Sequence, residues 1–167
     1  NRLVPNPMEP RATLGHYDSG EDHDTCWTTS QNPHVARLVM SAFYNVAPEN
    51  KLRVIAPDVG GGFGSKIYIY PEEIVCLWAS KKSGVPVKWV SDRTEAFLTD
   101  AHGRDHVTHV EMAFDKGNNI VGLKVDTIAN LGAYMSLFSS ATPTYLYATL
   151  LSGQYNIPAI HANVRTV

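Results

Sequence analysis

The sequence is poor in cysteine and in net charge, and it lacks any long apolar run. Its two cysteines, Cys26 and Cys76, both stand in apolar surroundings, which favours two buried reduced thiols over a disulfide or a metal pair. A net charge of −2 gives no attraction to nucleic acid or to an acidic membrane. Nothing resembles a signal peptide or a membrane span, so we expect a cytoplasmic protein that binds no nucleic acid and does not cross a membrane.

Several common catalytic motifs are also missing. There is no G-x-S-x-G motif, which argues against a serine hydrolase, and no pair of acids stands out as a catalytic dyad. His102, His106 and His109 have a spacing that would bring them together on a helix. The stretch "HVTHVEMAF" alternates like a strand, however, so His109 faces away from the other two and a zinc site is not expected.

The elements that the sequence does contain indicate an α+β fold in one domain piece, residues 1–167. An apolar fraction of 44% and a charged fraction of 18% are typical of a globular chain. The chain opens without methionine and stops within an expected strand, so we interpret it as a fragment of a longer protein. Strands and helices mix without strict alternation. We expect strands at 11–17, 24–30, 51–59, 85–91, 106–114, 120–134 and 161–167, and helices at 31–46, 71–84, 92–100 and 142–151.

The most unusual stretch is "PDVGGGFGSK", residues 57–66, which has four glycines within five positions. It fits neither the dinucleotide fingerprint nor the phosphate loop of nucleotide hydrolases, and the next helix begins only near Pro71. Glycines permit positive φ and let backbone amides approach a ligand, while Phe63 would supply an apolar wall. The stretch therefore suits a large, rigid, partly polar cofactor. The alternative is a tight turn in which Phe63 is a core residue.

Two further polar residues each allow two interpretations. Gln31 ends a strand just before an expected helix, where its side chain would either bond local backbone or point a neutral amide donor into a cleft. Lys66 could meet an anion, although a single loop lysine is usually solvated.

Several motifs together resemble the large subunits of molybdenum hydroxylases. They are "SQNPHVAR", "KLRVIAPDVGGGFGSK", "GVPVKWVSDRTE" and "AHGRDH", in that order and spacing, and "MEPRATLGHYD" and "TIANLGAYMS" fit as well. The resemblance spans essentially the whole chain. The family includes xanthine dehydrogenase, aldehyde oxidoreductases and aerobic carbon monoxide dehydrogenase, and the motifs are most similar to the carbon monoxide dehydrogenase branch, in its second form.

This resemblance implies a mixed-sheet molybdopterin-binding domain, the first such domain of a longer large subunit. Gly61, Gly62, Phe63 and Gly64 would bind the molybdenum–molybdopterin cofactor, in its cytosine dinucleotide form. Gln31 would act in catalysis by hydrogen-bonding an oxygen ligand of the molybdenum. No side chain would ligate the metal itself, and such outer donors orient and tune a metal centre.

The resemblance also implies the reaction and the partners. The enzyme would oxidise a small substrate with water as the oxygen source, and would pass electrons to an FAD-binding medium subunit and an iron–sulfur small subunit with 2Fe-2S clusters. The family's glutamate base and active-site loop lie outside these 167 residues, so we expect the fragment to be inactive alone. Copper would be present only if that loop carried a cysteine.

The substrate is left open by the resemblance, with one restriction. Ile67 stands where xanthine dehydrogenases carry an acidic substrate-binding residue, so a purine would lose a buried hydrogen bond worth on the order of 1–3 kcal/mol. Oxidation of carbon monoxide is the leading hypothesis, with hydroxylation of an aldehyde or an N-heterocycle as the alternative. A non-enzymatic alternative is a cofactor-free scaffold that keeps the fold.

Overall fold

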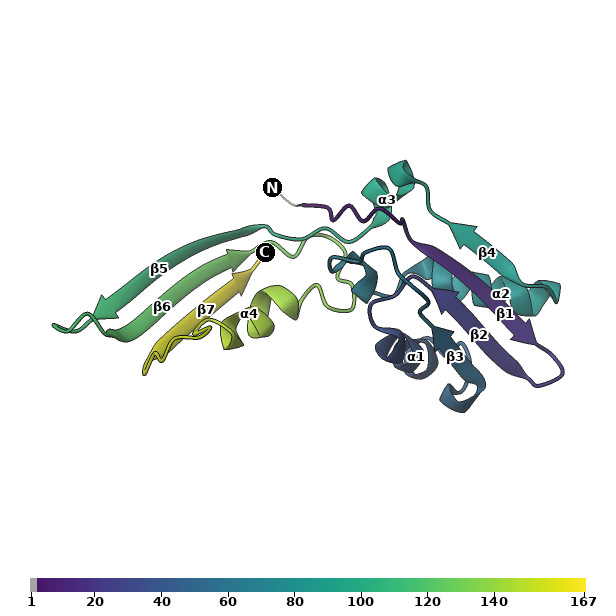
Figure 1. Cartoon of the computed structure of the whole chain (residues 1–167), viewed down its shortest axis with the longest axis horizontal. Coiled ribbons are helices and arrows are strands. Elements are labelled where there is room, and N and C mark those ends of the chain that lie inside the picture. The colour runs from purple at the N-terminus through teal and green to yellow at the C-terminus, as the bar shows by residue number, and fades with distance from the viewer. Residues whose placement is uncertain (1–2) are drawn as a thin grey trace. The chain divides into compact units, whose positions relative to one another are not determined.

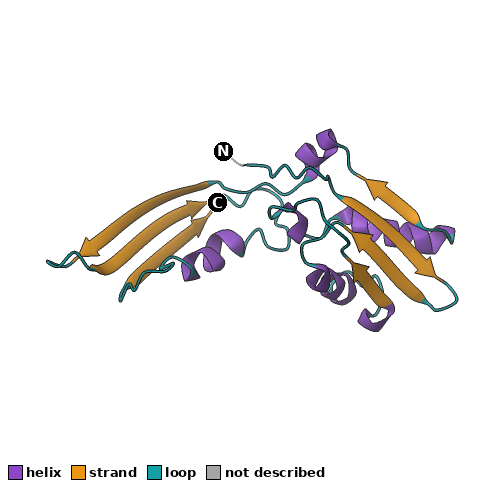
Figure 2. Ribbon diagram, viewed as in Figure 1, coloured by secondary structure: helices purple, strands orange, loops and turns teal. Residues whose placement is uncertain are grey.

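The computed structural model describes residues 3–167, which divide into two compact units. The N-terminal unit comprises Val4–His102, and the C-terminal unit comprises Leu3 together with Gly103–Val167. Both units combine strands with helices, which confirms the expected α+β class (Figure 2). The single domain piece expected from the sequence stays a prediction.

The N-terminal unit is built on a mixed four-stranded sheet in the order β3-β2-β1-β4 (Figure 1). Strand β1 pairs antiparallel with both β2 and β4, whereas β3 runs parallel to β2. The parallel pair needs a crossover connection, and the helix between the two strands supplies it. The strands are β1 (Ala12–Asp18), β2 (His23–Thr28), β3 (Leu52–Ile55) and β4 (Val87–Val90).

Three helices accompany this sheet: α1 (Pro33–Ala42), α2 (Pro71–Ser83) and α3 (Arg93–Thr99). Helix α2 starts with proline, carries its acidic residues in the first turn and its lysines in the last, and ends at Gly84 with φ +73°, as its sequence predicts. It packs closely on β1, because a Cβ added to Gly15 would lie 2.5 Å from the Cys76 carbonyl carbon. The core beneath these helices contains Cys26, Met40, Leu52 and Leu77.

Several expected elements are shorter in the structure, and the strand expected over 51–59, for example, comprises only Leu52–Ile55. The helix expected over 31–46 ends at Ala42, and Asn45 just beyond it has φ +51°, a left-handed conformation that a helix does not continue. Asn32 precedes the helix without a capping side-chain bond. The strand expected to reach residue 134 ends at Ala129, and Gly132 then turns the chain with φ +77°.

The C-terminal unit is a three-stranded sheet in the order β5-β6-β7 (Figure 1). A turn over 115–119 joins the antiparallel strands β5 (His106–Phe114) and β6 (Ile120–Ala129) into a hairpin. Strand β7 (Ile160–Thr166) runs parallel to β6. Between β6 and β7 lie a π-helical turn, Thr142–Leu146, and the short α4, Tyr147–Thr149.

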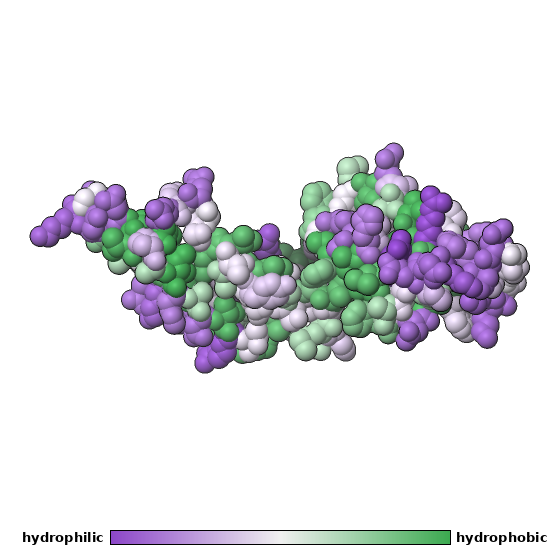
Figure 3. All heavy atoms as spheres, turned by 90° about the horizontal axis from the view of Figure 1, so that it is seen from below, coloured by the Kyte–Doolittle hydropathy of each residue, from purple (hydrophilic) through white to green (hydrophobic). Residues whose placement is uncertain are grey.

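The two faces of this second sheet differ in polarity. On one face, cross-strand partners such as Val110 and Val125 or Met112 and Leu123 are apolar, and on the other Glu111 pairs with Lys124. The apolar face is only partly covered, and hydrophobic side chains of this unit are visible at the surface in Figure 3. Its exposed apolar side chains include Val110, Met112, Phe114 and Ile160. Among residues 3–167, no helix is long and apolar enough to cross a membrane.

Candidate functional site

The glycine-rich loop has a backbone that only glycine-rich sequence can adopt. Gly61 has φ +91° and Gly64 has φ +93°, so both sit in the left-handed region that other residues avoid. A Cβ added to Gly60 would lie 2.5 Å from the Glu9 Cβ, and one added to Gly62 would lie 2.2 Å from Gln31 Oε1. These glycines therefore let two neighbouring segments approach the loop more closely than any side chain would allow.

Gln31 holds the loop from one side. Its Oε1 accepts hydrogen bonds from the backbone amides of Gly64, at 3.0 Å, and of Lys66, at 3.3 Å. The backbone N–H of Gln31 donates to the Lys66 carbonyl at 2.9 Å. These partners lie more than thirty residues along the chain, so the interpretation of a bond to local backbone was wrong. Because Oε1 faces the loop, the Gln31 NH2 group is turned away, and it has no partner among the described residues.

Lys66 is the most deeply buried charged group of the site. Its side chain is 0% exposed, so the expectation of a solvated lysine was wrong. The anion that it meets is Glu9, whose Oε2 lies 3.0 Å and whose carbonyl oxygen lies 2.7 Å from Lys66 Nζ. Sequence reasoning missed Glu9, and its only signal was a carboxylate in the "MEPRATLGHYD" motif.

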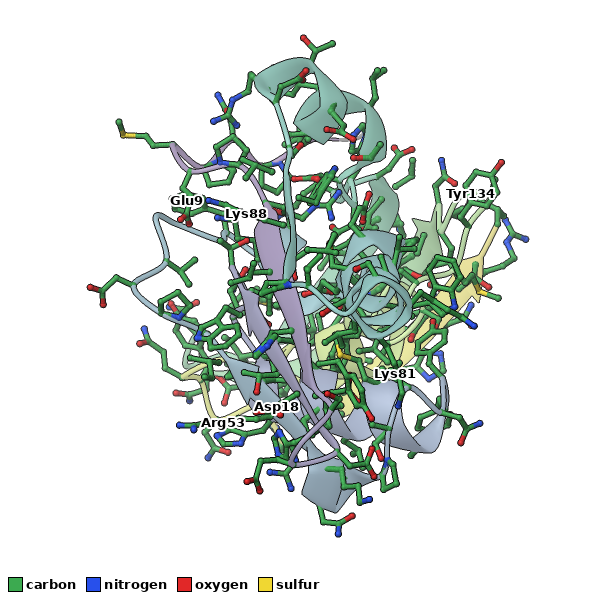
Figure 4. All side chains as sticks on the ribbon, turned by 90° about the vertical axis from the view of Figure 1, so that its right-hand side faces the viewer. Glu9, Asp18, Arg53, Lys81, Lys88 and Tyr134 are labelled. Carbon is green, nitrogen blue, oxygen red and sulfur yellow. The ribbon has the colours of Figure 1, made fainter. Side chains whose placement is uncertain are left out.

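Glu9 also binds the start of the loop. Its Oε2 accepts from the Gly60 amide at 2.7 Å, and its own amide donates to the Gly60 carbonyl at 3.3 Å. Burial acts to raise the pKa of Glu9, but the hydrogen bonds from Gly60 and Lys66 outweigh it and hold the pKa below its ordinary value. The carboxylate is therefore ionised at neutral pH. Figure 4 shows Glu9 just before β1, with Asp18 at the other end of that strand.

Phe63 occupies the loop in an unusual state. It has φ +51°, which is costly for a bulky residue, and the residue is 74% exposed. The alternative in which Phe63 is a core residue was therefore wrong. The backbone amides of Phe63 and of Gly62 have no partner among residues 3–167, so both are available to a ligand. Ile67 follows in a short 3-10 turn, Ser65–Ile67, and is half-buried.

A layer of side chains supports the loop from within the N-terminal unit. Tyr70 Oη donates to the Ser65 carbonyl at 2.7 Å and accepts from the Ala101 amide at 2.9 Å. Burial raises the pKa of Tyr70, which keeps the phenol protonated as a donor. The Arg11 guanidinium lies 3.6 Å from the centre of the Tyr70 ring and is ion-paired with Asp100 at 2.6 Å.

The enclosed space behind the loop is too small for an organic ligand. A cavity of about 10 Å³, lined among others by Arg11, Lys66, Tyr70 and Glu73, has room for roughly one water molecule. A cofactor would therefore have to meet the exposed side of the loop, where the Phe63 ring stands.

The three histidines considered as a metal site do not form one. Strand β5 begins at His106, whose ring packs edge-on against Tyr147, and His109 lies 3.8 Å from Glu111. His102 Nε2 lies 3.2 Å from the Phe97 carbonyl oxygen. Across residues 3–167, no three histidine, cysteine or acidic side chains are grouped so that they could hold a metal ion.

Comparison with known protein families identifies the family of the chain. A family model described as "Molybdopterin cofactor-binding domain" matches residues 1–167, the whole sequence. The chain belongs to this family. The match includes residues of both compact units, and the molybdenum hydroxylase resemblance of the sequence motifs is confirmed.

Individual relatives of this molybdopterin cofactor-binding domain act on different substrates. The carbon monoxide dehydrogenase large chain of Hydrogenophaga pseudoflava is 40% identical over 169 residues, which is 99% of this chain and 20% of that protein. The nicotine 6-hydroxylase large subunit of Paenarthrobacter nicotinovorans is 35% identical over 160 residues, 95% of this chain and 20% of that protein. The crystal structure of quinoline 2-oxidoreductase from Pseudomonas putida 86 matches with a TM-score of 0.86 and 31% identity, over 99% of this chain and 21% of that one.

The chain spans about a fifth of the length of the curated relatives it matches. The fold and the molybdenum oxidoreductase family are shown, and the matched relatives carry names for carbon monoxide, nicotine and quinoline chemistry alike.

Proposed function

We propose that the loop over residues 60–66 binds the molybdenum–molybdopterin cofactor of an oxidoreductase large subunit. The observation that carries the proposal is Phe63, a bulky residue held at positive φ with an exposed ring, next to two amides that lack partners. Backbone strain of this kind costs on the order of 1–3 kcal/mol and persists where the surroundings over-determine it, which is typical of ligand-binding sites.

The residues present fit such a cofactor. Gly62 and Phe63 offer backbone N–H donors to an electron-rich ligand, and Gly61, Gly62 and Gly64 place no side chain between these donors and the ligand. The Phe63 ring offers a flat apolar surface. When bound, the cofactor supplies the two-electron oxidation chemistry, while the chain binds and orients it.

Gln31 adds a neutral donor to the same site. Its carbonyl oxygen is occupied by the amides of Gly64 and Lys66, so its NH2 group can donate only outward. We propose that it donates to a polar atom of the cofactor close to the metal. A neutral amide in this place tunes the charge distribution without adding a charge or a metal ligand.

The proposed reaction is the oxidation of carbon monoxide, with hydroxylation of an aldehyde or an N-heterocycle as the alternative. The 40% identity to a carbon monoxide dehydrogenase large chain supports the first, and the 35% identity to a nicotine hydroxylase supports the second. Ile67, half-buried and apolar beside the loop, suits a small or apolar substrate better than a purine.

The proposal includes the rest of the assembly. The relatives are named as a large chain and a large subunit, which supports the presence of further subunits. We propose that these partners carry FAD and 2Fe-2S clusters and that the cofactor is in its cytosine dinucleotide form. The glutamate base, and any cysteine that would bring copper, are proposed to lie outside these residues. A cytoplasmic location agrees with two buried cysteines that form no disulfide.

The test is molybdenum analysis of the full-length complex, expressed with functional cofactor biosynthesis, followed by assays with carbon monoxide, aldehydes and N-heterocycles. Gln31→Ala should lower turnover by about 10²-fold or less, as loss of one outer donor does elsewhere. Arg53→Ala, an exposed residue on β3, should behave like the wild type. A wild-type complex that contains no molybdenum would instead support the scaffold alternative.

A further inference from the structure

Among residues 3–167, Glu9 is hydrogen-bonded only to the two ends of the glycine-rich loop. Its amide and its Oε2 bind Gly60, and its Oε2 and carbonyl oxygen bind Lys66 Nζ. One residue therefore joins the point where the loop begins to the point where it ends. We infer that Glu9 and Lys66 form a clamp that positions the Gly62 and Phe63 amides for the cofactor. This inference rests on the proposed function.

The clamp reaches the site through Lys66. The backbone of Lys66 donates to Gln31 Oε1 and accepts from the Gln31 amide, while its side chain binds Glu9. Lys66 thus connects the outer donor Gln31 to the clamp, and the two amides without partners lie between the clamped ends. A displacement of Lys66 would move Gln31 and the loop together.

Burial makes the two partners unequal. Lys66 is 0% exposed along its side chain, whereas Glu9 is 37% exposed. Removing the Glu9 charge leaves a cation without a counter-charge in the interior, while removing the Lys66 charge leaves a carboxylate that water can reach. Lys66→Met is therefore the milder change, and Glu9→Gln the harsher one. A variant with both changes removes both charges and leaves neither stranded.

The experiment measures amide hydrogen exchange of a loop peptide spanning residues 57–66, in the full-length complex with and without cofactor. Loss of a charge-assisted hydrogen bond should speed exchange about tenfold in both single variants. The double variant should recover overall stability while its loop stays fast to exchange. In cofactor-loaded protein we expect altered Mo(V) electron paramagnetic resonance parameters in all three variants.

Two controls separate positioning from stability. Glu49→Gln breaks an exposed ion pair, Arg37–Glu49 at 2.6 Å, and should leave both the loop exchange and the spectrum unchanged. Leu77→Ala weakens the buried core without touching the loop, so it should lower the melting temperature but keep the wild-type spectrum.

The clamp is overturned if loop exchange in Lys66→Met and in the double variant matches that of Glu49→Gln. It is also overturned if the spectrum shifts equally in Leu77→Ala. Absence of molybdenum from the wild-type complex would defeat the proposed function instead, and in that case exchange of the cofactor-free loop still decides whether the clamp exists.

Discussion

The two units of the chain differ in how many of their apolar side chains they bury. The N-terminal unit buries Cys26, Met40, Leu52 and Leu77 in one core between its sheet and helices. The C-terminal unit buries few large apolar side chains, and all nine residues of its strand β5 are exposed. The glycine-rich loop lies in the first unit. A loop that holds a strained Phe63 needs rigid surroundings, and the packed core of the N-terminal unit provides them.

The largest expected effect is on the free energy of unfolding, and it compares a truncated side chain in each unit. Leu77→Ala removes a fully buried side chain from the N-terminal core and should lower the free energy of unfolding by about 2–5 kcal/mol. Met112→Ala on β5, where the side chain is 45% exposed, should cost less than about 1 kcal/mol. Chemical denaturation of both variants checks this. Equal losses would contradict the contrast between the units.

The second test compares ion pairs. Arg11→Met leaves Asp100 buried without its cation, which should cost about 3 kcal/mol, since both side chains are almost inaccessible. Lys124→Met breaks a solvent-exposed pair with Glu111 in the C-terminal unit and should not change the unfolding midpoint measurably. Unfolding at low and high salt provides the check, because only a surface pair is screened. A salt-sensitive loss in Arg11→Met would count against burial as the cause.

The third test changes the pH, because the N-terminal unit buries a titratable thiol, Cys26. Burial, the largest cause, raises the pKa of the Cys26 thiol from 9.0 to about 12. The folded state therefore holds this proton more tightly than the unfolded state. The resulting stability is complete below pH 9 and is lost as the pH rises towards 12, and the loss at pH 10 is on the order of 1 kcal/mol.

Denaturation midpoints between pH 8 and pH 11 measure this loss, and Cys26→Ala serves as the control. That variant should have a flatter alkaline profile than the wild type. Alkylation of the native protein at pH 8 should also leave Cys26 unmodified, and rapid modification would show that the thiol is more accessible than the structure indicates.

The smallest expected effect on stability concerns the loop itself. Phe63→Gly relieves positive-φ strain of about 1–2 kcal/mol but adds conformational freedom to the unfolded chain, so the net change should stay within about 1 kcal/mol. Molybdenum retention in the full complex should nevertheless fall, because the apolar wall is gone. Calorimetry together with metal analysis checks both. Unchanged retention would remove Phe63 from the proposed site.

Much of the fold was predictable from sequence, and the reasons are local. Pro71, the acidic first turn and Gly84 fixed helix α2 at its observed ends, and the "DKGNN" turn fixed the β5–β6 hairpin. The predicted C-terminal ends of the first helix and of β6 were wrong. The left-handed residues Asn45 and Gly132 interrupt these elements, although the residues around them still favour a helix and a strand.

The site was predictable only in part. The glycines and Phe63 identified the loop, but Lys66 was expected in solvent and Glu9 was not noticed. Their pairing spans 57 residues and depends on how two segments meet in space. Periodicity and turn chemistry report on neighbours along the chain, so neither contains information about such a contact. The family motifs marked both segments without showing that they touch.

The clamp also has a consequence for the order of assembly. Glu9, Gln31 and Lys66 come from three separate parts of the chain, so the loop has no fixed shape until all three have been brought together. Contacts of such long sequence separation form only after the entropy of closing the intervening chain has been overcome. The binding loop should therefore be among the last parts of its unit to become ordered, and cofactor insertion should follow folding rather than guide it.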